Sequence, residues 1–297
     1  MMHDTRKTIR FIINPASGSS RSRSKDVEQL IEQYLDKTLF IPEVVFSHAP
    51  GQVLALSREA ADKGINVVVA VGGDGSVNEV AKGLTGSNVT LGIIPIGSGN
   101  GLARHLNIPM EAARAIETLN TGKTMLIDTV SINDNQFVSI AGVGFDALVA
   151  DKFAQSESRG FLTYFRIATR AYPFYKPKKY VLDIDGEMVK RRALFISFAN
   201  SDQFGYNTTI APDADITDGL MDVCIVQKIP MFKAPLIAHL LLAKKIDQSS
   251  YVEIIQAKQV FLRRRKNEII NIDGEPVLLS RDLSLKVNHL ALRVAIP

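Results

Sequence analysis

Residues 67–80 read Val67-Val68-Val69-Ala70-Val71-Gly72-Gly73-Asp74-Gly75-Ser76-Val77-Asn78-Glu79-Val80, an apolar run that ends in three glycines around one aspartate. The apolar run predicts a buried strand, and the pattern from Val77 onward predicts a helix. Glycines let the backbone turn sharply and approach a bound group, and the free N–H groups at a helix N-terminus favour phosphate. Asp74 would repel a phosphate unless it handles a metal, a proton or a ribose hydroxyl. The stretch therefore indicates phosphoryl chemistry rather than simple anion capture.

Strand and helix patterns alternate around this stretch, from Thr8 to about Asp128, and the alternation predicts a parallel sheet covered on both faces. The expected strands are 8–13, 43–47, 67–71 and 89–94, and the expected helices are 24–35, 52–63, 77–84 and 110–120. Beyond Asp128 short strand patterns dominate, with helices only near 161–171 and 232–243. We therefore expect an α/β domain over residues 1–130 and a β-rich domain over residues 131–297. Whether the last strand returns to the first domain stays open.

The composition limits the class of protein. The 297 residues are 46% hydrophobic and carry a formal net charge of +4, which is too small a bias for a dedicated nucleic-acid binder. The single cysteine, Cys224, excludes a disulfide within the chain, favours a reducing cytoplasm and, with five scattered histidines, argues against a zinc site. The apolar stretch near the N-terminus, 9–13, is short, and the next candidate, 234–243, is half of the roughly twenty residues that a membrane span needs. A soluble protein without a transmembrane span is expected.

Three loops of similar composition each follow a predicted strand: Asn14–Gly18, Gly72–Ser76 and Gly97–Gly101. Ligands of open parallel sheets bind at the carboxyl ends of the strands, so these loops are expected to line one cleft. Their glycine amides would form an anion nest. The hydroxyl groups available to a phosphate are those of Ser17, Ser76 and Ser98. Neither the P-loop pattern nor the spaced dinucleotide fingerprint is present, so the signal lies in the conjunction of the three loops.

These motifs resemble the diacylglycerol kinase catalytic-domain family, which includes bacterial lipid kinases, sphingosine kinases and ceramide kinases. The resemblance rests first on Asn14-Pro15-Ala16-Ser17-Gly18, Gly72–Glu79 and Pro95–Asn100. It continues in order through Ala141–Asp146, Pro212–Gly219 and Ile272–Pro276, and so covers nearly the whole chain. It implies a Rossmann-like parallel α/β domain and a C-terminal β-rich sandwich domain similar to that of NAD kinases.

The resemblance also implies a role for individual residues. The expected ATP-binding residues are Asn14, Pro15, Ala16, Ser17, Gly18, Ser47, Gly72, Gly73, Asp74, Gly75, Ser76, Val77, Asn78, Glu79, Gly97, Ser98 and Asn100. Asp74 would lie beside the triphosphate and its Mg²⁺. The segment of Asp215, Asp218 and the backbone of Leu220 would hold a second Mg²⁺, and Asp128 would join the metal network. Asp273 and Glu275 match the motif of the general base, with Glu275 favoured.

The physical reading of the carboxylates agrees with these roles. Phosphoryl transfer needs charge neutralisation, positioning and a base for the proton of the attacking hydroxyl. Asp74 cannot serve as metal ligand and base together, so a second carboxylate is expected, and Glu275 comes from a tight Asp-Gly turn. An ordinary hairpin turn is the alternative for this segment. For Asp213–Gly219 the alternative is an acidic surface loop.

The sequence of the third loop bears on which lipid accepts the phosphoryl group. Gly97-Ser98-Gly99-Asn100-Gly101 lacks the acidic residue of many bacterial diacylglycerol kinases and is similar to the sphingosine kinase version. The lipid acceptor therefore stays open between diacylglycerol, a sphingoid long-chain base and another long-chain alcohol. Two alternatives to a lipid kinase remain. One is an NAD kinase-like enzyme, and the other is a non-catalytic nucleotide-sensing protein of membrane surfaces.

Basic clusters at Lys176–Lys179, Lys190–Arg192 and Arg263–Lys266 suit either solvated loops or anionic lipid headgroups. The aromatic stretch Phe161–Tyr175 is expected to be core, with a lipid entrance as the alternative. The expected partner is a lipid presented at a membrane surface, without nucleic acid. Peripheral association with the inner face of the membrane and formation of a homodimer are both left open.

Overall fold

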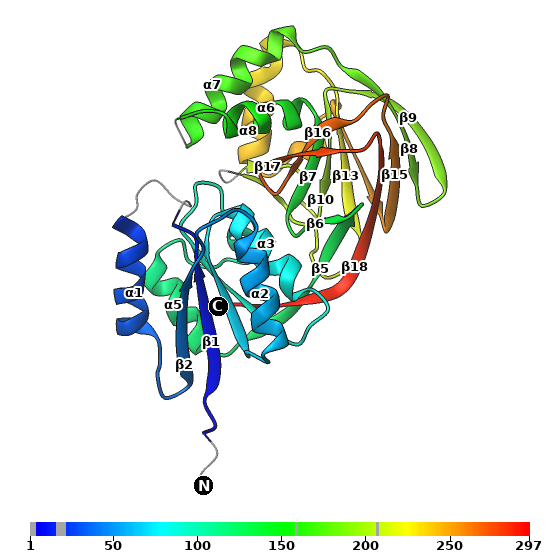
Figure 1. Cartoon of the computed structure of the whole chain (residues 1–297). Helices are drawn as coiled ribbons and strands as arrows, with labels where there is room; N and C mark the ends of the chain where they lie inside the picture. Colours follow the sequence, from blue (N-terminus) through cyan, green and yellow to red (C-terminus); the bar gives the residue numbers. More distant parts are fainter. Residues whose placement is uncertain (1–3, 16–21, 158–159, 206–207) are drawn as a thin grey trace. The chain divides into compact units, whose positions relative to one another are not determined.

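The computed structural model describes residues 4–15, 22–157, 160–205 and 208–297. The chain forms two compact units (Figure 1). The first unit runs up to Ile127 and takes in the C-terminal residues from Leu290, and the second unit comprises Asp128–His289. The division lies close to the boundary expected near residue 130, and the end of the last strand returns to the first unit.

The first unit is built on a parallel sheet of four strands in the order β2-β1-β3-β4. These strands are β1 (Lys7–Ile13), β2 (Phe40–Phe46), β3 (Val67–Gly72) and β4 (Thr90–Pro95). The end of the long strand β18 (Asp282–Ala295) extends the sheet, where Arg293 and Val294 run parallel to Thr90 and Leu91. Every residue of β3 is buried, as expected for a strand at the centre of a covered sheet.

Helices cover this sheet as the alternating pattern predicted. They are α1 (Ser22–Tyr34), α2 (Gln52–Asp62), α3 (Asp74–Leu84), α4 (Gly101–His105) and α5 (Ala112–Asn120). Helix α1 packs against α5, and α2 packs against α3. The chain leaves β1 toward β2 but leaves β3 toward β4, so the strand order reverses between β1 and β3. This reversal is the topological switch point at which such sheets bind ligands.

Two details near the glycine turn differ from expectation. Helix α3 begins at Asp74 and not near Val77, because Gly73 is extended and serves as the N-cap. An aspartate in the first turn of a helix interacts favourably with the helix dipole. The short helix α4 was not predicted, because Gly97–Gly101 was treated as loop and five residues leave little periodicity to detect.

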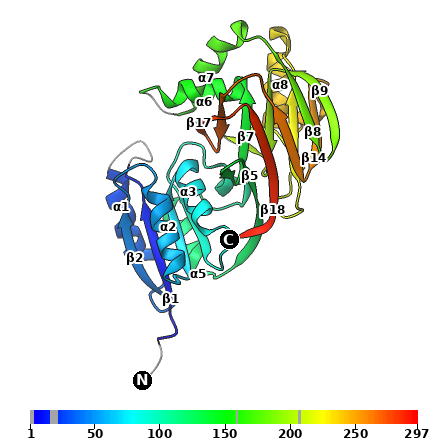
Figure 2. The same cartoon turned by 45° about the vertical axis from the view of Figure 1, so that its right-hand side comes forward.

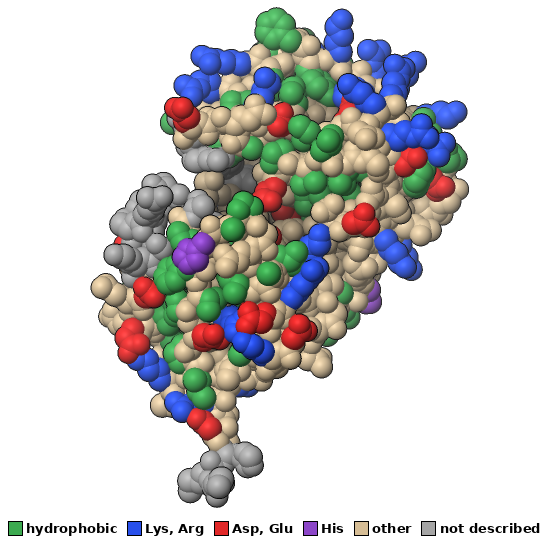
Figure 3. Space-filling model, viewed as in Figure 1, with side chains coloured by type: hydrophobic (Ala, Val, Ile, Leu, Met, Phe, Trp, Pro, Cys, Tyr) green, Lys and Arg blue, Asp and Glu red, His purple; other side chains and the backbone are tan. Residues whose placement is uncertain are grey.

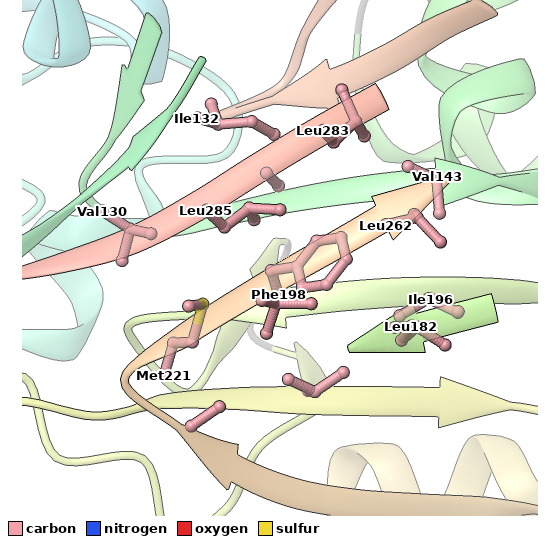
Figure 4. Packing of buried hydrophobic residues seen from close by; sticks show 14 of the residues in the cluster. Val130, Ile132, Val143, Leu182, Ile196, Phe198, Met221, Leu262, Leu283 and Leu285 are labelled. Carbon is pink, nitrogen blue, oxygen red and sulfur yellow. The ribbon is translucent and has the colours of Figure 1, made fainter. Parts of the chain in front are cut away.

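The second unit is a β-sandwich. Its strands include β6 (Asn135–Phe137), β7 (Ile140–Gly144), β8 (Lys178–Ile184), β9 (Glu187–Ala193), β10 (Phe195–Ala199), β11 (Gln203–Gly205), β12 (Thr208–Thr209), β13 (Met221–Val226), β14 (Val252–Ala257), β15 (Gln259–Arg263), β16 (Glu268–Ile272) and β17 (Glu275–Leu279), after β5 (Thr124–Ile132). One sheet has the order β14-β13-β10-β7-β16-β17, and β18, β15, β8 and β9 follow one another in the other. Side chains such as Phe198, Leu262 and Leu285 fill the space between them (Figure 4).

Helices form a third layer on the outer face of the six-stranded sheet (Figures 1 and 2). This layer contains α6 (Phe145–Ala154), α7 (Phe161–Ala171) and α8 (Ala234–Leu242), with single-turn helices η1 (Tyr172–Phe174), η2 (Met231–Lys233) and η3 (Ile246–Gln248). A second core lies beneath it, around Phe145, Phe195 and Val226. Helix α6 was not predicted, and α8 begins at Ala234 rather than Phe232. The expectation that 161–175 is core is wrong for Phe161, Phe165 and Phe174, which are exposed.

Candidate functional site

Asn14, which opens the first loop, meets the second and third loops at the carboxyl ends of β1, β3 and β4. The backbone N–H of Asn14 donates to the carbonyl of Val71 at 3.3 Å, and its side-chain Nδ2 donates to Ser76 Oγ at 3.1 Å. The N–H of Ile96 donates to the carbonyl of Gly72 at 3.0 Å. The first loop is thus bonded to the second, and the second to the third, at the switch point of the sheet.

Glycines allow the second and third loops to approach one another. A Cβ atom on Gly97 would lie 2.5 Å from the Cα of Gly73, and one on Gly99 would lie 2.6 Å from Asp74 Oδ2. Such contacts are too short for a Cβ atom. The backbone of Gly73 cannot move aside cheaply, and Asp74 Oδ2 is held in place by the N–H of Asn100. Glycine is therefore required at both positions.

Asp74 connects helix α3 to the third loop. Its Oδ2 accepts from the N–H of Asn100 at 2.8 Å, and its Oδ1 accepts from the N–H of Gly101 at 2.6 Å. Burial raises the pKa of Asp74, although these amides and the charge of Arg104 act in the opposite direction. Each carboxylate oxygen can accept a second bond, so the group can anchor the loop and still face a ligand.

Asn100 has a left-handed backbone with φ of 57°. Its Nδ2 donates to the carbonyl of Gly97 at 2.9 Å, and its buried Oδ1 has no hydrogen-bond partner among the described residues. A buried polar atom without a partner costs about 1–3 kcal/mol. This cost falls on a residue that the sequence already assigned to the nucleotide site, and a ligand donor would remove it.

Other predicted residues of this site have structural partners. The buried Ser47 donates its N–H to the carbonyl of Ile13 at 2.9 Å, so the end of β2 is held against β1. Glu79 Oε2 accepts from the N–H of Leu54 at 3.1 Å, in the first turn of α2. Ala16, Ser17 and Gly18 lie outside the described residues. The remaining predicted members lie in the same loops or in the first turns of α3: Pro15, Gly75, Val77, Asn78 and Ser98.

The sequence did not single out Arg104. Its Nε donates to the carbonyl of Gly99 at 2.9 Å, so a cation supports the third loop. The only signal was a basic residue four positions after Asn100, and such a spacing within an unpredicted helix carries little information.

In the second unit, the Asp273 carboxylate is enclosed by backbone donors. Its Oδ1 accepts from the N–H of Ser139 at 3.0 Å and of Ile140 at 2.8 Å, and its Oδ2 accepts from Val138 at 2.9 Å. Only 3% of the residue is exposed, and its φ is 45°. Aspartate tolerates this left-handed conformation in a turn. Glu275, two residues later, is exposed at the start of β17.

The predicted metal segment lies in the same unit. Asp215 Oδ1 accepts from the N–H of Thr217 at 2.9 Å, and Asp218 Oδ1 accepts from the N–H of Leu220 at 2.8 Å. The fully buried Asp128 accepts from the N–H of Gly219 at 2.6 Å. Among the described residues, no group of three or more acidic, histidine or cysteine side chains is assembled to hold a metal ion.

Carboxylates nevertheless crowd this segment. Burial, followed by the negative charges of Asp218 and Asp213, raises the pKa of Asp222 to about 6. A divalent cation would relieve this repulsion. Mg²⁺ commonly uses one or two protein carboxylates and completes its shell with water, so the donors fit that ion.

An apolar cavity of about 190 Å³ lies in the second unit, between the helical layer and the six-stranded sheet. Its lining includes Phe145, Tyr164, Phe195, Val226 and Ile237. Asp146 is the only carboxylate among the described residues that line it. Burial raises the pKa of Asp146 to about 6, although hydrogen bonds from Asn271 and Tyr164 act in the opposite direction.

Comparisons with known proteins agree with this architecture. A family model for the diacylglycerol kinase catalytic domain matches residues 8–132, and a model for the YegS C-terminal NAD kinase beta sandwich-like domain matches residues 139–295. The diacylglycerol kinase of Bacillus subtilis (strain 168) is 27% identical over 274 residues, which cover 91% of this chain and 90% of that protein. One from Staphylococcus aureus (strain MRSA252) is 24% identical, with 91% and 86% covered.

Solved structures share the fold. The crystal structure of a diacylglycerol kinase from Bacillus anthracis str. Sterne superposes with a TM-score of 0.74 at 17% identity, covering 98% of this chain and 97% of that one. Together with the two family models, the fold and the glycine loops define a two-domain kinase. The chain belongs to the diacylglycerol kinase catalytic-domain family, and it is an enzyme of the lipid kinase class. Within the described residues, no helix is both long and apolar enough to cross a membrane.

Proposed function

We propose that this protein transfers the γ-phosphoryl group of ATP to the hydroxyl of a lipid such as diacylglycerol or a sphingoid long-chain base. The observation that carries the proposal is the junction of three glycine loops around Asp74 at the switch point of the first unit. The apolar cavity of the second unit supports a lipid acceptor, since its wall would suit an acyl or alkyl chain.

ATP would lie along the three loops of the first unit. Its phosphates would accept bonds from the glycine amides and from Ser76 and Ser98, and the N-terminus of α3 would favour their charge. The unsatisfied Oδ1 of Asn100 would accept a bond from the nucleotide, because adenine and ribose both carry donors. Asp74 would hold the third loop in place while facing the triphosphate.

Glu275 would accept the proton of the attacking lipid hydroxyl. The structure supports this choice over Asp273, because three backbone amides already occupy the Asp273 carboxylate. Asp273 would instead fix the turn from which Glu275 projects. A base must lie within hydrogen-bond reach of its proton, so the position of this turn would control the rate.

Mg²⁺ would be held by Asp218, Asp215 and the backbone of Leu220 in the second unit, and a further Mg²⁺ would accompany ATP near Asp74. When bound, Mg²⁺ supplies positive charge that neutralises phosphate oxygens. Gly219 lies between Asp218 and Leu220, and its N–H donates to Asp128, so this carboxylate would orient the segment. Mg²⁺ should raise the melting temperature of the wild type but not of Asp218→Asn.

The acceptor can be identified with purified protein, radiolabelled ATP and a total lipid extract, with mass spectrometry of the product. We expect one phosphorylated lipid class, and separate assays with diacylglycerol and sphingosine in detergent micelles would then name it. The relatives named above are diacylglycerol kinases, whereas the third loop is similar to that of sphingosine kinases. Phosphorylation of NAD alone would instead establish an NAD kinase-like enzyme.

Two substitutions test the base. Glu275→Gln keeps the shape of the side chain and removes its basicity, so activity should fall at least about 100-fold while ATP binding is retained. Glu187→Gln, which alters an exposed carboxylate at the start of β9, is the matched control and should be active. Wild-type activity in folded Glu275→Gln would remove Glu275 from this role.

We also propose that the second unit binds reversibly to an anionic membrane surface. Exposed apolar side chains lie on α7, η1, η2 and α8, among them Phe174, which is 85% exposed, and Phe232, which is 80% exposed. Arg166 and Arg170 of α7 are also exposed, and Figure 3 shows Lys and Arg side chains along the outer rim of this unit. Apolar side chains among cations suit the interface of an anionic bilayer.

The membrane proposal is tested by sedimentation with vesicles. Phe174→Ser with Phe232→Ser should reduce binding to phosphatidylserine vesicles, and neutral vesicles should bind the wild type less well. Leu39→Ser with Leu278→Ser, which removes exposed apolar side chains from the turn before β2 and from β17, is the control. Equal binding by both double variants would contradict the proposed surface.

A further inference from the structure

A chain of buried hydrogen bonds runs from the apolar cavity to the turn that carries Glu275. Asp146, in the first turn of α6, accepts from Nδ2 of Asn271 on β16 at 2.9 Å. Oδ1 of Asn271 accepts from the N–H of Gly274 at 2.9 Å. Gly274 lies between Asp273 and Glu275, so a single amide side chain links the cavity wall to this turn.

The residues around this link shield it from water and leave room for it. Asp146 is 3% exposed and Asn271 is 8% exposed. Gly142 lies opposite Asn271 in the pairing of β7 with β16, and a Cβ atom there would lie 1.9 Å from Asp146 Oδ2. Only glycine at this position leaves room for the carboxylate.

The charge of Asp146 fixes the orientation of Asn271. An ionised carboxylate only accepts hydrogen bonds, so the NH₂ group of Asn271 must face it. The amide oxygen is then directed at the N–H of Gly274. The reversed amide would place oxygen against the carboxylate and NH₂ against the N–H of Gly274, and would lose both bonds.

The other end of this series of hydrogen bonds lies at the wall of the cavity. Asp146 and Tyr164 both line it, and the Tyr164 hydroxyl bonds to the Asp146 carboxylate. A lipid chain in the cavity would displace water from this wall. Hydrogen bonds strengthen as their surroundings become less polar.

We propose that Asp146 is a positioning residue that couples occupancy of the cavity to the orientation of the Asp273–Glu275 turn through Asn271. The proposal rests on the assignment of Glu275 and of the cavity to the kinase reaction. It predicts that the coupling favours acceptors with chains long enough to reach the Asp146 wall.

A donor–acceptor exchange tests the link. In Asn271→Asp two buried carboxylates face one another and would share a proton at neutral pH, so the variant is assayed at about pH 9, where both are ionised and the bond is lost. There kcat for a long-chain acceptor should fall at least about tenfold with KM for ATP unchanged. In the double variant Asp146→Asn/Asn271→Asp, Asn at 146 donates to Asp at 271, whose other oxygen accepts from Gly274. Its kcat should return to within about threefold of wild type.

Lipid acceptors of different chain length distinguish the proposed coupling from a general effect of the substitutions on folding. The ratio of kcat/KM for long-chain over short-chain acceptors should fall in Asn271→Asp and recover in the double variant. Melting temperatures of all variants are measured alongside. Unchanged kcat in folded Asn271→Asp, or a double variant no more active than Asn271→Asp, would overturn the proposal.

A second measurement does not depend on kinase activity. Hydrogen exchange is followed at the backbone of residues 268–279 with and without a monoacylglycerol. Protection of the Gly274 amide should increase on addition of the lipid in the wild type and the double variant, but not in Asn271→Asp. No increase in the wild type would reject the coupling, whereas failure to phosphorylate any lipid would reject the proposed function instead.

Discussion

At the scale of single residues, the first unit depends on close contacts that only glycine permits. Gly97→Ala would push its Cβ into the backbone of Gly73, so the second and third loops must separate. We expect the free energy of unfolding to fall by about 1–3 kcal/mol and nucleotide affinity to fall with it. Isothermal calorimetry with ATP and urea unfolding measure the two effects.

The matched control is Gly64→Ala. Gly64 has open space around its Cβ position but a φ of 71°, so the substitution strains only the local backbone. It should cost about 1 kcal/mol of stability and leave ATP binding intact. Equal ATP affinity in the two variants would show that the contact of the loops does not shape the nucleotide site.

A second residue-scale prediction concerns pH. Burial raises the pKa of Asp146 to about 6, well above the value of a free aspartate. The protonated form is therefore the better tolerated one in the fold, and Asp146 stabilises the protein most below about pH 4. This contribution is lost as pH rises through 6 and amounts to at most about 3 kcal/mol.

Asp146→Asn removes this titration. Between pH 4 and 7 the melting temperature of Asp146→Asn should decline less steeply than that of the wild type. Asp62→Asn, which changes an exposed carboxylate on α2, is the control and should follow the wild-type curve. Parallel curves for the wild type and Asp146→Asn would contradict the raised pKa.

The sequence could predict the residues of the candidate site in the first unit because each stands in a short local motif. Asp74 and Asn100 stand in the segments that follow β3 and β4, so their neighbourhood follows from the topology of a parallel sheet. Asp146 was noticed within a motif but received no role, and Asn271 was not noticed at all. Their contact joins residues 125 positions apart, and no local pattern in either segment indicates the other.

At the scale of elements, the turn between β16 and β17 is held by the loop before β7 rather than by its own hairpin alone. Asp273→Ala would leave the amides of Val138, Ser139 and Ile140 without their acceptor in the interior. We expect the free energy of unfolding to fall by about 3 kcal/mol or more, since each buried unsatisfied amide costs about 1 kcal/mol or more. Urea unfolding measures this loss.

Glu275→Gln provides the comparison within the same turn. Its side chain is exposed, so its stability should change by no more than about 0.5 kcal/mol. A large effect at Asp273 and a small one at Glu275 would separate the structural carboxylate from the proposed base. The opposite order would reverse these assignments.

Elements with strong periodicity were predicted well, and the exceptions have physical causes. Helix α7 was expected at its observed position because its apolar residues recur at helical spacing. Helix α6 was missed because its own residues are mostly apolar and its few charged residues do not gather on one face. The sequence therefore shows no polar face that marks it as a helix. The aromatic stretch after it divides between core and surface, which composition alone does not reveal.

At the scale of the whole molecule, strand β18 joins the two units through one continuous segment. Its first part pairs with β15 in the second unit, and its end pairs with β4 in the first. Leu290, where the division falls, has a φ of 49°, so the backbone of β18 departs from extended geometry at the residue where the strand changes unit. The nucleotide-binding unit is therefore complete only when the last residues of the chain are in place.

The final prediction follows from this connection. Leu292 and Val294 are fully buried in the first unit, and the carbonyl of Ala291 accepts from the N–H of Gly86 at 2.8 Å. Leu292→Ser with Val294→Ser should cost about 5 kcal/mol, a large part of the stability of an ordinary domain. Since the lost contacts belong to the first unit, its amides should exchange faster while the sandwich core around Phe198 stays protected. Hydrogen exchange with mass spectrometry distinguishes the units.

Lys286→Ser is the control, because Lys286 is exposed on the same strand within the second unit. It should leave exchange and ATP binding at wild-type levels. The double variant should lose ATP binding although no substituted residue belongs to the three glycine loops, because β4 carries the third loop and would lose its neighbouring strand. Retention of ATP binding, with exchange unchanged in the first unit, would mean that the four strands β1–β4 form the nucleotide-binding fold without β18.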